Sequence, residues 1–404
     1  MVTEYSMESN IKGKKILILG AGTWLVPHIK KAKELGLITY VTDWSNNAVG
    51  KNEADFFAPI DLRDKEGTLK YAIEHNIDAI YTSADIGVQT AAYVANQLGL
   101  CYHSEELAFN ATNKRAMREK SSKIGLNIPQ FCSVKQLSEA KIAAAKIGYP
   151  VVVKPVDNSS SRGVSVVNNE QELDFFFTES KEASFEGTVL IEEFMQGMEG
   201  SVEALISNGK VHIMGVCDKI KSALPYRYDL ELNYPGNYTS YQLILIHEFI
   251  DKLVSGFEIK EGIIHVEIMV NSDSVKLIEF GLRGCGSKVV THLLPKMLNF
   301  DILKYLVMSS FGYHEPIYFS NNRFGVLKFI MLNQGIIKEI IGKDDVLKID
   351  GIVDFEIERN PNDEITFIKD GRSRPGYLLA HADNKNELNT IVTRAINTFL
   401  VTYK

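Results

Sequence analysis

Two glutamates in neighbouring apolar runs of the sequence could bind a metal cation. A short polar turn joins the runs, and together they predict a β-hairpin with one carboxylate in each strand. With a loop of 272–274, position 271 pairs with 275, which places Glu267 opposite Glu279 on one face. Like charges placed opposite each other destabilise a sheet, and carboxylates in apolar runs need a partner. A divalent cation would supply one; a surface hairpin with two solvated glutamates is the alternative.

Three basic residues are placed where they could bind anions. Lys154 ends the apolar strand 151–155, VVVKP, and a lysine is costly to bury unless it meets an anion. Arg162 lies in the loop 157–163, DNSSSRG, whose backbone amides and hydroxyls suit closure over phosphates. A simple polar hairpin loop is the alternative for this segment. Arg283 follows the glutamate hairpin in a glycine-rich turn, so an anion site would lie a few residues from the cation site.

A third segment suits a nucleobase and its ribose. A predicted strand ends at Glu192 and Glu193, and Phe194 and Met195 then provide apolar surface. Glu199 follows and precedes a second predicted strand. Adenine binding needs hydrogen-bond acceptors beside an apolar slot, and a carboxylate a few residues later can hold ribose hydroxyls. No single residue of this segment is diagnostic.

The composition is that of an ordinary globular protein. The chain has 404 residues, enough for two or three domains, with 45% apolar and 24% charged side chains. A net charge of -7 argues against a broad nucleic-acid surface, and no apolar run approaches the ~20 residues of a membrane span. The cysteines are widely spaced and form no CxxC pair, so a reducing cytoplasm fits best. We therefore expect a cytoplasmic protein without a nucleic-acid or membrane partner.

The residues before these segments predict an α/β domain. Strands at 15–19 and 38–42 flank a glycine turn and a helix, which is the opening of a doubly wound parallel sheet. Residues 20–22, GAG, begin a dinucleotide-binding fingerprint, but Leu25 occupies its third glycine position. Asp43, after the second strand, could hold a ribose hydroxyl or cap the next turn. We favour the structural interpretation of both features.

A predicted helix at 114–124 carries a basic cluster. Lys114, Arg115 and Arg118 lie on this helix, and Gly125 marks its end. Basic side chains on a helix usually form a solvated face, and this is the favoured interpretation when the helix is considered alone.

The segment between the ribose-type strand and the hairpin is the candidate for substrate recognition. It contains enough charge and aromatic surface to bind a small zwitterion such as an amino acid. A solvated loop is the alternative, and the acidic net charge argues weakly against a polyanionic substrate. The residues concerned are Asp218, Lys219, Arg227, Tyr228 and Tyr234.

The order of these pieces resembles the ATP-grasp superfamily. A lysine on a helix, VVVKP, a serine-rich loop, IEEFMQGMEGSVE, HVE and IEFGLRGCG follow one another along the chain. The pattern is most similar to carboxylate–amine ligases such as L-amino-acid ligases, and more distantly to biotin carboxylase and the large subunit of carbamoyl-phosphate synthase. The similarity extends over nearly the whole chain, including Gly335 and the tail at 371–400. Several separated motifs are far more specific than any one of them.

The resemblance implies a fold and a division into domains. We expect a mixed α/β and α+β protein, in which an N-terminal doubly wound parallel-sheet domain precedes an ATP-grasp fold. That fold has two α+β subdomains with the nucleotide between them. The expected boundaries are 1–109 for the N-terminal domain, 110–193 for the small lid subdomain with its linking helix, and 194–404 for the large subdomain with the metal hairpin and the C-terminal portion.

The resemblance also implies an ATP site. Its residues should contact the phosphates, the adenine and the ribose in turn, and Lys154 should act in catalysis together with Arg283. The implied ATP-binding residues are Lys114 and Lys154 at the phosphates, Arg162 in the covering loop, Glu192 at the adenine amino group, the backbone of Glu193 and Met195 beside it, and Glu199 at the ribose.

At the hairpin, the resemblance assigns Glu267 and Glu279 to Mg²⁺, or to Mn²⁺ in its place. Arg283 would bind the substrate carboxylate or the acyl phosphate formed from it, and His265 matches the family's HvE strand with a packing role. One position departs from the pattern. The family usually has an asparagine two residues after the second metal glutamate, as a further ligand, whereas this chain has Gly281, which offers no side-chain oxygen.

The implied reaction is an ADP-forming ligation. The carboxylate of an amino acid or related acid would be activated by ATP as an acyl phosphate and joined to an amine, with release of ADP and phosphate. The expected partners are these small substrates and a second copy of the chain in a homodimer. Two alternatives stay open. One is a bicarbonate-using carboxylase or carbamoyl-phosphate type enzyme, and the other is a degenerate nucleotide-binding protein without efficient turnover, for which Gly281 is the main argument.

Overall fold

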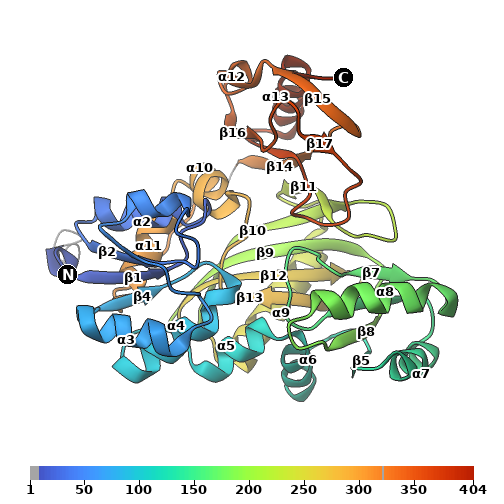
Figure 1. Ribbon diagram of the computed structural model, residues 1–404, viewed down its shortest axis with the longest axis horizontal. Coiled ribbons are helices and arrows are strands. Elements are labelled where there is room, and N and C mark those ends of the chain that lie inside the picture. The colour runs from blue at the N-terminus through green and yellow to red at the C-terminus, as the bar shows by residue number, and fades with distance from the viewer. Residues whose placement is uncertain (1–8, 321–322) are drawn as a thin grey trace.

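The computed structural model describes residues 9–320 and 323–404. Within these ranges the strands form an N-terminal parallel sheet, a small antiparallel sheet, a long antiparallel sheet and a short C-terminal one. In Figure 1 the N-terminal unit lies at the left, the small sheet at the lower right, and the C-terminal residues above the long sheet. This architecture confirms the predicted mixture of α/β and α+β structure. No helix in the described ranges is long and apolar enough to cross a membrane.

The N-terminal unit is a parallel sheet with the strand order β3-β2-β1-β4, which confirms the predicted doubly wound domain. Figure 1 shows α2 on one side of the sheet and α3 and α4 on the other. Because helices cover both faces, the apolar central strand is buried along nearly its whole length. The elements are β1 (Lys15–Leu19), α2 (Val26–Glu34), β2 (Ile38–Thr42), η1 (Val49–Glu53), β3 (Phe56–Ala58), α3 (Lys65–His75), β4 (Ala79–Tyr81) and α4 (Asp85–Leu98).

The glycine turn after β1 is closed by Asp43. The Asp43 carboxylate accepts hydrogen bonds from the backbone amides of Ala21 (2.9 Å) and Ser45 (2.9 Å). Leu25, at the position of the missing third glycine, is buried in the core. Both features therefore serve the fold, and the structural interpretation of the turn is confirmed.

A pair of helices leads from this unit to the small sheet. The sheet is antiparallel, in the order β5-β8-β6-β7, and its apolar residues form a core of their own beneath α7 and α8. A unit with its own core can move as one body. The elements are α5 (Glu105–Thr112), α6 (Lys114–Lys123), β5 (Phe131–Val134), α7 (Leu137–Ile147), β6 (Val151–Pro155), β7 (Ser165–Val167), α8 (Glu170–Ala183) and β8 (Val189–Glu193).

The long sheet holds the predicted metal hairpin at one end. All of its neighbouring strands pair antiparallel, in the order β13-β12-β9-β10-β11-β14-β18-β16. Helix α9 packs on this sheet through a large apolar cluster. Its elements up to residue 309 are β9 (Met198–Ser207), β10 (Lys210–Lys221), β11 (Asp229–Tyr234), α9 (Ser240–Gly256), β12 (Gly262–Val270), β13 (Val275–Gly281), η2 (Val289–Leu293), α10 (Leu294–Leu298) and α11 (Ile302–Ser309).

The C-terminal residues extend the long sheet and add a short sheet of their own, in the order β17-β15-β19. Because β14 pairs with β11, one continuous sheet runs from the hairpin to the C-terminal portion. The division of the chain at residues 109 and 193 stays a prediction. The elements are β14 (Phe324–Ile330), β15 (Gly335–Ile341), α12 (Lys343–Val346), β16 (Ile352–Ile357), β17 (Glu364–Ile365), β18 (Gly376–Ala382), α13 (Lys385–Thr398) and β19 (Leu400–Tyr403).

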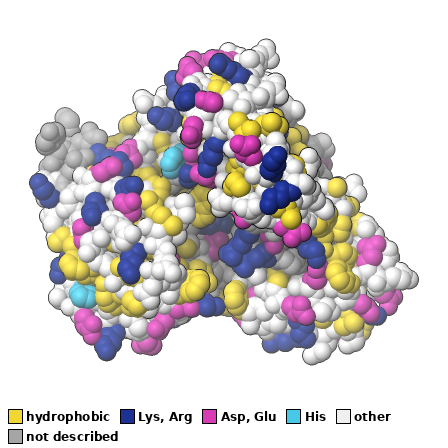
Figure 2. All heavy atoms as spheres, turned by 45° about the horizontal axis from the view of Figure 1, so that its top comes forward, with side chains coloured by type: hydrophobic (Ala, Val, Ile, Leu, Met, Phe, Trp, Pro, Cys, Tyr) yellow, Lys and Arg dark blue, Asp and Glu magenta, His cyan; other side chains and the backbone are white. Residues whose placement is uncertain are grey.

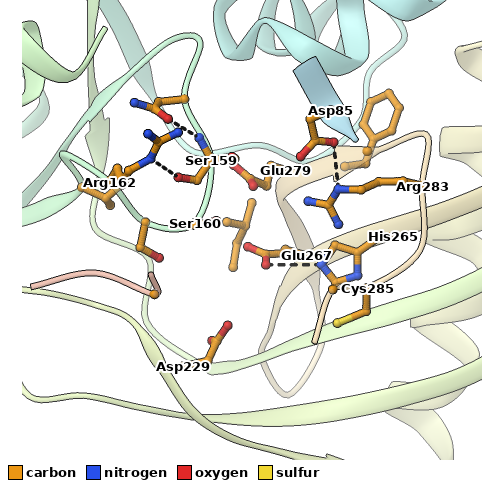
Figure 3. Close-up of a pocket in the computed structure, with 18 of the residues that line it drawn as sticks. Asp85, Ser159, Ser160, Arg162, Asp229, His265, Glu267, Glu279, Arg283 and Cys285 are labelled. Atoms are coloured by element: carbon orange, nitrogen blue, oxygen red, sulfur yellow. Dashed lines mark hydrogen bonds and ion pairs between the residues drawn. The ribbon is translucent and has the colours of Figure 1, made fainter. Parts of the chain in front are cut away.

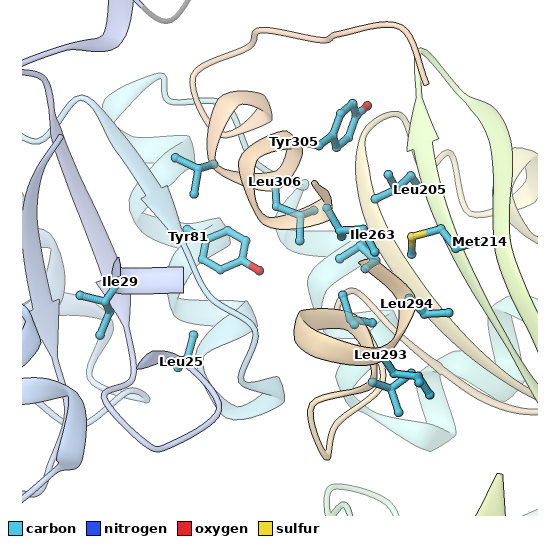
Figure 4. Close-up of a cluster of buried hydrophobic side chains, with 14 of the residues drawn as sticks. Leu25, Ile29, Tyr81, Leu205, Met214, Ile263, Leu293, Leu294, Tyr305 and Leu306 are labelled. Carbon is cyan, nitrogen blue, oxygen red and sulfur yellow. The ribbon is translucent and has the colours of Figure 1, made fainter. Parts of the chain in front are cut away.

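An apolar cluster joins the N-terminal unit to the long sheet. Figure 4 shows Tyr81 from β4 and Leu25 near α2 on one side, with Ile263 and Leu205 from the long sheet on the other. Helices α10 and α11 fill the space between them, for example with Leu306. Burying one such side chain contributes about 1.5–3 kcal/mol, so this cluster fixes the N-terminal unit over the hairpin end of the sheet.

His28 allows a test of how α2 packs on the parallel sheet. Its ring is buried and stacks on Tyr81, with the ring centroids 5.2 Å apart. Burial lowers the pKa of His28 from 6.5 to about 4. Between these values the unfolded chain binds more protons than the folded one, so His28 costs the fold stability as the pH falls from 6.5 to 4. We expect His28→Phe to have a flatter pH dependence of the free energy of unfolding in this window, measured with urea; an unchanged slope would contradict the buried neutral ring.

Candidate active site

A cleft of about 1000 Å³ opens between the N-terminal unit, the small sheet and the long sheet. Figure 2 shows it as a hollow below the C-terminal portion, with lysine and arginine side chains gathered in it. The structure brings every predicted site residue to this cleft, while the role of each remains a prediction. These residues are Lys114, Lys154, Arg162, Glu192, Glu193, Met195, Glu199, Glu267, Glu279 and Arg283.

The turn of the hairpin differs from the prediction. Val270 pairs with Val275, so the loop consists of residues 271–274 and the predicted pairing of Asn271 with Val275 is wrong. The loop is closed by a hydrogen bond from the Asn271 amide to the Ser274 carbonyl, 2.9 Å long. This longer loop shifts the register at the turn by one residue.

A β-bulge nevertheless brings the two glutamates face to face. The register set at the turn would place Glu267 opposite Ile278. A shift between Glu267 and Ile268 pairs Glu267 with Glu279 instead, as predicted. A bulge adds a residue to one strand and re-aims the side chains beside it, which is why bulges occur at functional sites.

Each glutamate of the pair is neutralised by a lysine from another element. Lys219 on β10 lies 2.5 Å from Glu267 Oε1, and Lys114 at the start of α6 lies 3.0 Å from Glu279 Oε2. Burial tends to raise the pKa of Glu267, but the Lys219 ammonium and the His265 ring hold it well below its usual range. Two neighbouring carboxylates that line a cleft are a donor set that suits Mg²⁺. The residues present therefore fit a divalent cation, which would compete with the lysines.

His265 connects Glu267 to a second, fully buried carboxylate. Its Nδ1 contacts Glu203 on β9, and its Nε2 lies 3.4 Å from Glu267 Oε1. Burial alone would lower the pKa of His265, but the Glu203 carboxylate raises it to about 9. Glu203 also accepts a hydrogen bond from the Cys285 amide (2.8 Å), which fixes the turn after Arg283. The packing role expected for His265 is therefore incomplete, because the ring also supports Glu267 electrostatically.

Glu192 lies in a buried ion-pair network. Arg118 Nε is 2.8 Å from Glu192 Oε1, and Lys154 Nζ is 2.7 Å from Glu192 Oε2. Burial alone would raise the pKa of Glu192. The two cations outweigh this effect and lower the pKa below its usual value, so the carboxylate is ionised. Arg118 also donates a hydrogen bond of 2.6 Å to the Ile278 carbonyl on β13. The network therefore ties α6 and the small sheet to the hairpin.

Arg118 is a site residue whose importance the sequence analysis missed. The interpretation of the basic cluster as a solvated face is wrong for Arg118, since its side chain is 0% exposed. A signal was present, because Lys114 and Arg118 are four residues apart and share one face of the helix.

The serine-rich loop is held at the edge of the cleft by one hydrogen bond within the loop and one from the C-terminal portion. Arg162 Nε donates a hydrogen bond to the Ser159 carbonyl (3.3 Å) within the loop. The Gly371 amide, from the C-terminal portion, donates one to the Ser160 carbonyl (3.1 Å). Figure 3 shows Ser159, Ser160 and Arg162 on the opposite side of the cavity from Arg283. The loop thus joins the small sheet to the C-terminal portion, a contact that the sequence did not predict.

Arg283 is held in place by the N-terminal unit. Its Nε donates to Asp85 Oδ1 (2.8 Å), and its Nη1 donates to the Gly284 carbonyl (2.9 Å). Burial would lower the pKa of Arg283, but Asp85 raises it, so the guanidinium stays charged. Asp85 is the first residue of α4 and lines the cleft. It is a second site residue that the sequence analysis missed, because a contact across 198 positions leaves no local pattern.

The remaining predicted glutamates also have basic partners. Glu193 accepts a hydrogen bond from Lys276 (2.9 Å). Glu199 pairs with Lys221 (2.8 Å) and Arg227 (3.1 Å), and it lies within β9 rather than before a strand. Both carboxylates are therefore fixed in position at the cleft, and their contacts with a nucleotide stay predictions.

The predicted substrate segment reaches the cleft only in part. Lys219 and Arg227 line it, whereas Asp218, Tyr228 and Tyr234 do not. Tyr234 is buried in the core, and Asp218 accepts hydrogen bonds from two nearby asparagines. These three residues therefore do not take part as predicted: Asp218 and Tyr234 lie on strands, where alternate positions point to opposite faces of the sheet, and Tyr228 lies just before β11.

Comparison with known protein families identifies two regions of the chain. Residues 147–291 match the model of the ATP-grasp domain, and residues 328–404 match that of the L-amino acid ligase C-terminal domain 2. The formate-dependent phosphoribosylglycinamide formyltransferase of Wolinella succinogenes is 32% identical over 209 residues, which are 51% of this chain and 54% of that protein. The match therefore spans about half of this chain and about half the length of this curated relative.

Solved structures agree with this result at the level of the fold. The L-amino acid ligase from Bacillus licheniformis superimposes with a TM-score of 0.82 and 20% identity, covering 97% of this chain and 99% of that one. The phosphoribosylglycinamide synthetase from Anaerococcus prevotii gives a TM-score of 0.76 and 21% identity, covering 97% and 100%. These likenesses confirm the predicted fold over nearly the whole chain.

The buried network around Glu192 predicts a strong dependence on Arg118. Arg118→Leu would leave the Glu192 carboxylate buried with Lys154 as its remaining cation partner. We expect the free energy of unfolding to fall by about 3–5 kcal/mol, measured with urea, because Glu192 would lose its hydrogen bonds from the guanidinium and the Ile278 carbonyl would lose its donor inside a buried ion-pair network. Arg115→Leu on the same helix is the matched control and should change stability by less than about 1 kcal/mol. Equal stability of the two variants would contradict the network's role.

Proposed function

Because this chain carries an ATP-grasp domain followed by an L-amino acid ligase C-terminal domain, we propose that it is an ADP-forming carboxylate–amine ligase. One substrate is an amino acid or a related small acid, and the other is an amine. The observation that carries the proposal is the meeting of two facing glutamates, two lysines and an arginine in one cleft.

In the proposed complex, ATP lies between the small sheet and the long sheet. Lys154, Lys114 and Arg162 bind its phosphates, and the serine-rich loop covers them. The fixed position of Lys154 beside Glu192 supports this arrangement, because a buried ammonium with one carboxylate partner retains donors for a phosphate. The remaining contacts are Glu192 with the adenine amino group, the backbone of Glu193 and Met195 with the adenine ring, and Glu199 with the ribose.

Glu267 and Glu279 hold Mg²⁺ in this proposal. The ion supplies positive charge to the phosphate oxygens at which negative charge accumulates. Two lysines of this chain would supply further positive charge. Lys114 would exchange its contact with Glu279 for one with a phosphate, and Lys219 would remain beside the anionic substrate groups. His265 contacts Glu203 through one ring nitrogen and Glu267 through the other, and in this way it would keep Glu267 oriented.

The proposed chemistry has two steps. A carboxylate oxygen of the acid attacks the γ-phosphorus of ATP, the bond from that phosphorus to the β,γ-bridging oxygen breaks, and ADP leaves. The amine nitrogen then attacks the acyl carbon, the carbon–oxygen bond to phosphate breaks, and the nitrogen loses its proton to phosphate or water. Positioning and charge stabilisation suffice for both steps, so no nucleophilic side chain is needed.

Arg283 orients the acid in this scheme. Within residues 9–320 and 323–404, its Nε and Nη1 donate to Asp85 and Gly284 and its Nη2 makes no hydrogen bond, so Nη2 can donate to the substrate carboxylate. The serine-rich loop, docked on Gly371, would keep water away from the acyl phosphate.

The proposal predicts ADP release that depends on an acid and an amine together. We would screen amino acids and small carboxylates, singly and in pairs, and identify the products by mass. Glu279→Gln should lower the rate by a factor of about 10²–10³, because it removes a charge that holds the cation. Glu364→Gln, at an exposed position of β17, is the matched control and should behave like the unchanged protein.

Two outcomes would argue against a carboxylate–amine ligase, and a third would argue against the metal assignment alone. ADP release stimulated by bicarbonate alone would favour a carboxylase or carbamoyl-phosphate type enzyme. Tight, magnesium-dependent ATP binding without ADP release for any acid and amine pair would favour a non-catalytic nucleotide-binding protein. Full activity in Glu279→Gln would show that the metal assignment is wrong.

A further inference from the structure

Glu203, His265 and Cys285 bring three potential metal-binding atoms together. A carboxylate oxygen, an imidazole nitrogen and the thiol sulfur all lie within 4.8 Å of one another. Glu203 and His265 are buried, and Cys285 is partly buried. In the part of the chain that the structure describes, this is the one group of three or more histidine, cysteine or acidic side chains that is close enough to share an ion. It does not include Glu267 or Glu279.

The three side chains converge from separate segments of the long sheet. Glu203 on β9 and His265 on β12 are directly opposite each other in an antiparallel pair, so their side chains lie on the same face. Cys285 lies in the turn after β13, and its amide donates a hydrogen bond of 2.8 Å to Glu203 Oε2. Figure 3 shows Cys285 next to the His265 ring. The backbone therefore fixes the positions of all three residues, and their wide separation in sequence leaves no local metal-binding pattern.

Two of the three side chains can be reached from the cleft. His265 and Cys285 line it, whereas Glu203 is fully buried and does not. The Cys285 sulfur is not in a disulfide and, among the described residues, it has no hydrogen-bond partner. An ion that enters from the cleft would therefore meet a free thiol and an imidazole before it reaches the buried carboxylate.

The chemistry of these donors selects among cations. Mg²⁺ takes oxygen ligands in octahedral geometry, whereas a thiolate together with an imidazole suits zinc. A tetrahedral zinc ion with bonds of about 2.0–2.3 Å spaces its ligand atoms roughly 3.3–3.8 Å apart. Because the three atoms already lie within 4.8 Å of one another, small side-chain rotations would bring them to these distances. Zinc would enter between Glu203 and His265 Nδ1, which are in contact, and would replace the proton between them.

We propose that Glu203, His265 and Cys285 form a zinc site, separate from the proposed magnesium site of Glu267 and Glu279. Zinc binds the Cys285 thiolate, His265 Nδ1 and a Glu203 oxygen, and the protons of the thiol and of Nδ1 pass to water. Three protein ligands leave a fourth position, which a water molecule fills from the cleft. His265 Nε2, which lies 3.4 Å from Glu267, is not used by zinc, so both metal sites can be occupied together.

The competing explanation is that Glu203 and His265 only support Glu267, and that Cys285 only packs in its turn. The test is titration of the full chain with Co²⁺, a spectroscopic substitute for zinc, in the presence of excess Mg²⁺. Cobalt bound to a thiolate has a charge-transfer absorption in the near ultraviolet, which cobalt bound to oxygen ligands alone does not have. We expect this band to form on Co²⁺ binding and to disappear when Zn²⁺ is added, because a tetrahedral site with a thiolate favours zinc.

Variants identify the ligands. Cys285→Ser and Cys285→Ala should both lose the cobalt–thiolate band. His265→Gln should weaken zinc binding by at least about 100-fold, because loss of an outer partner of a metal ligand alone costs about 10–100-fold. Cys132→Ser, at an exposed cysteine, is the matched control and should keep the band.

A second measurement uses the unchanged protein, so it does not depend on whether the variants fold, which circular dichroism would establish. Zinc should slow the alkylation of Cys285 by iodoacetamide, followed by peptide mass, and should leave that of Cys132 unchanged. The inference is overturned if Co²⁺ gives no thiolate band, if a folded Cys285 variant keeps the band, or if zinc does not protect Cys285. None of these measurements involves ATP or ligation, so their outcome is independent of the proposed function.

Discussion

The site depends on one electrostatic constraint: two glutamates face each other across a hairpin. At about 4 Å two like charges repel by several kcal/mol near a protein surface, so the arrangement needs cations close by. The chain provides them from elements far apart in sequence, with Lys219 on β10 and Lys114 at the start of α6. Satisfying the pair therefore fixes where the linking helix and the long sheet must lie relative to each other. The geometry of the cleft follows from this requirement.

Neutralisation of a glutamate by basic side chains occurs a second time, at a more deeply buried position. Glu192 is buried between Arg118 and Lys154, and Arg118 also binds a carbonyl of β13. Because charges buried without partners are costly, this network holds the small sheet and the hairpin in one relative position. The small sheet has its own apolar core, so the network is an ion-pair contact between two separately packed bodies. Apolar packing builds each body, and ion pairs set the relation between them.

Local sequence patterns were sufficient for the elements and for part of the site. Apolar runs located β1, β6 and the hairpin, and an assumed three-residue loop placed Glu267 opposite Glu279. The turn was misjudged because loop length and a bulge offset each other, and neither is visible in the alternation. Arg118 and Asp85 escaped because their charged partners lie 74 and 198 positions away along the chain. The domain boundaries and ligand roles stay predictions, since they depend on motions and molecules that a single chain does not specify.

Lys114 links the two halves of the proposed reaction site. It lies between Glu279 Oε2 (3.0 Å) and the carbonyl of Asn158 in the covering loop (2.6 Å). A cation that took Glu279 would leave this ammonium without its carboxylate, and a phosphate below the loop is the partner that could replace it. A phosphate that took Lys114 would in turn leave Glu279 facing Glu267 without its counter-ion. Each ligand therefore restores the charge balance that the other disturbs. In the proposed complex, metal and nucleotide would therefore bind more tightly together than either would alone.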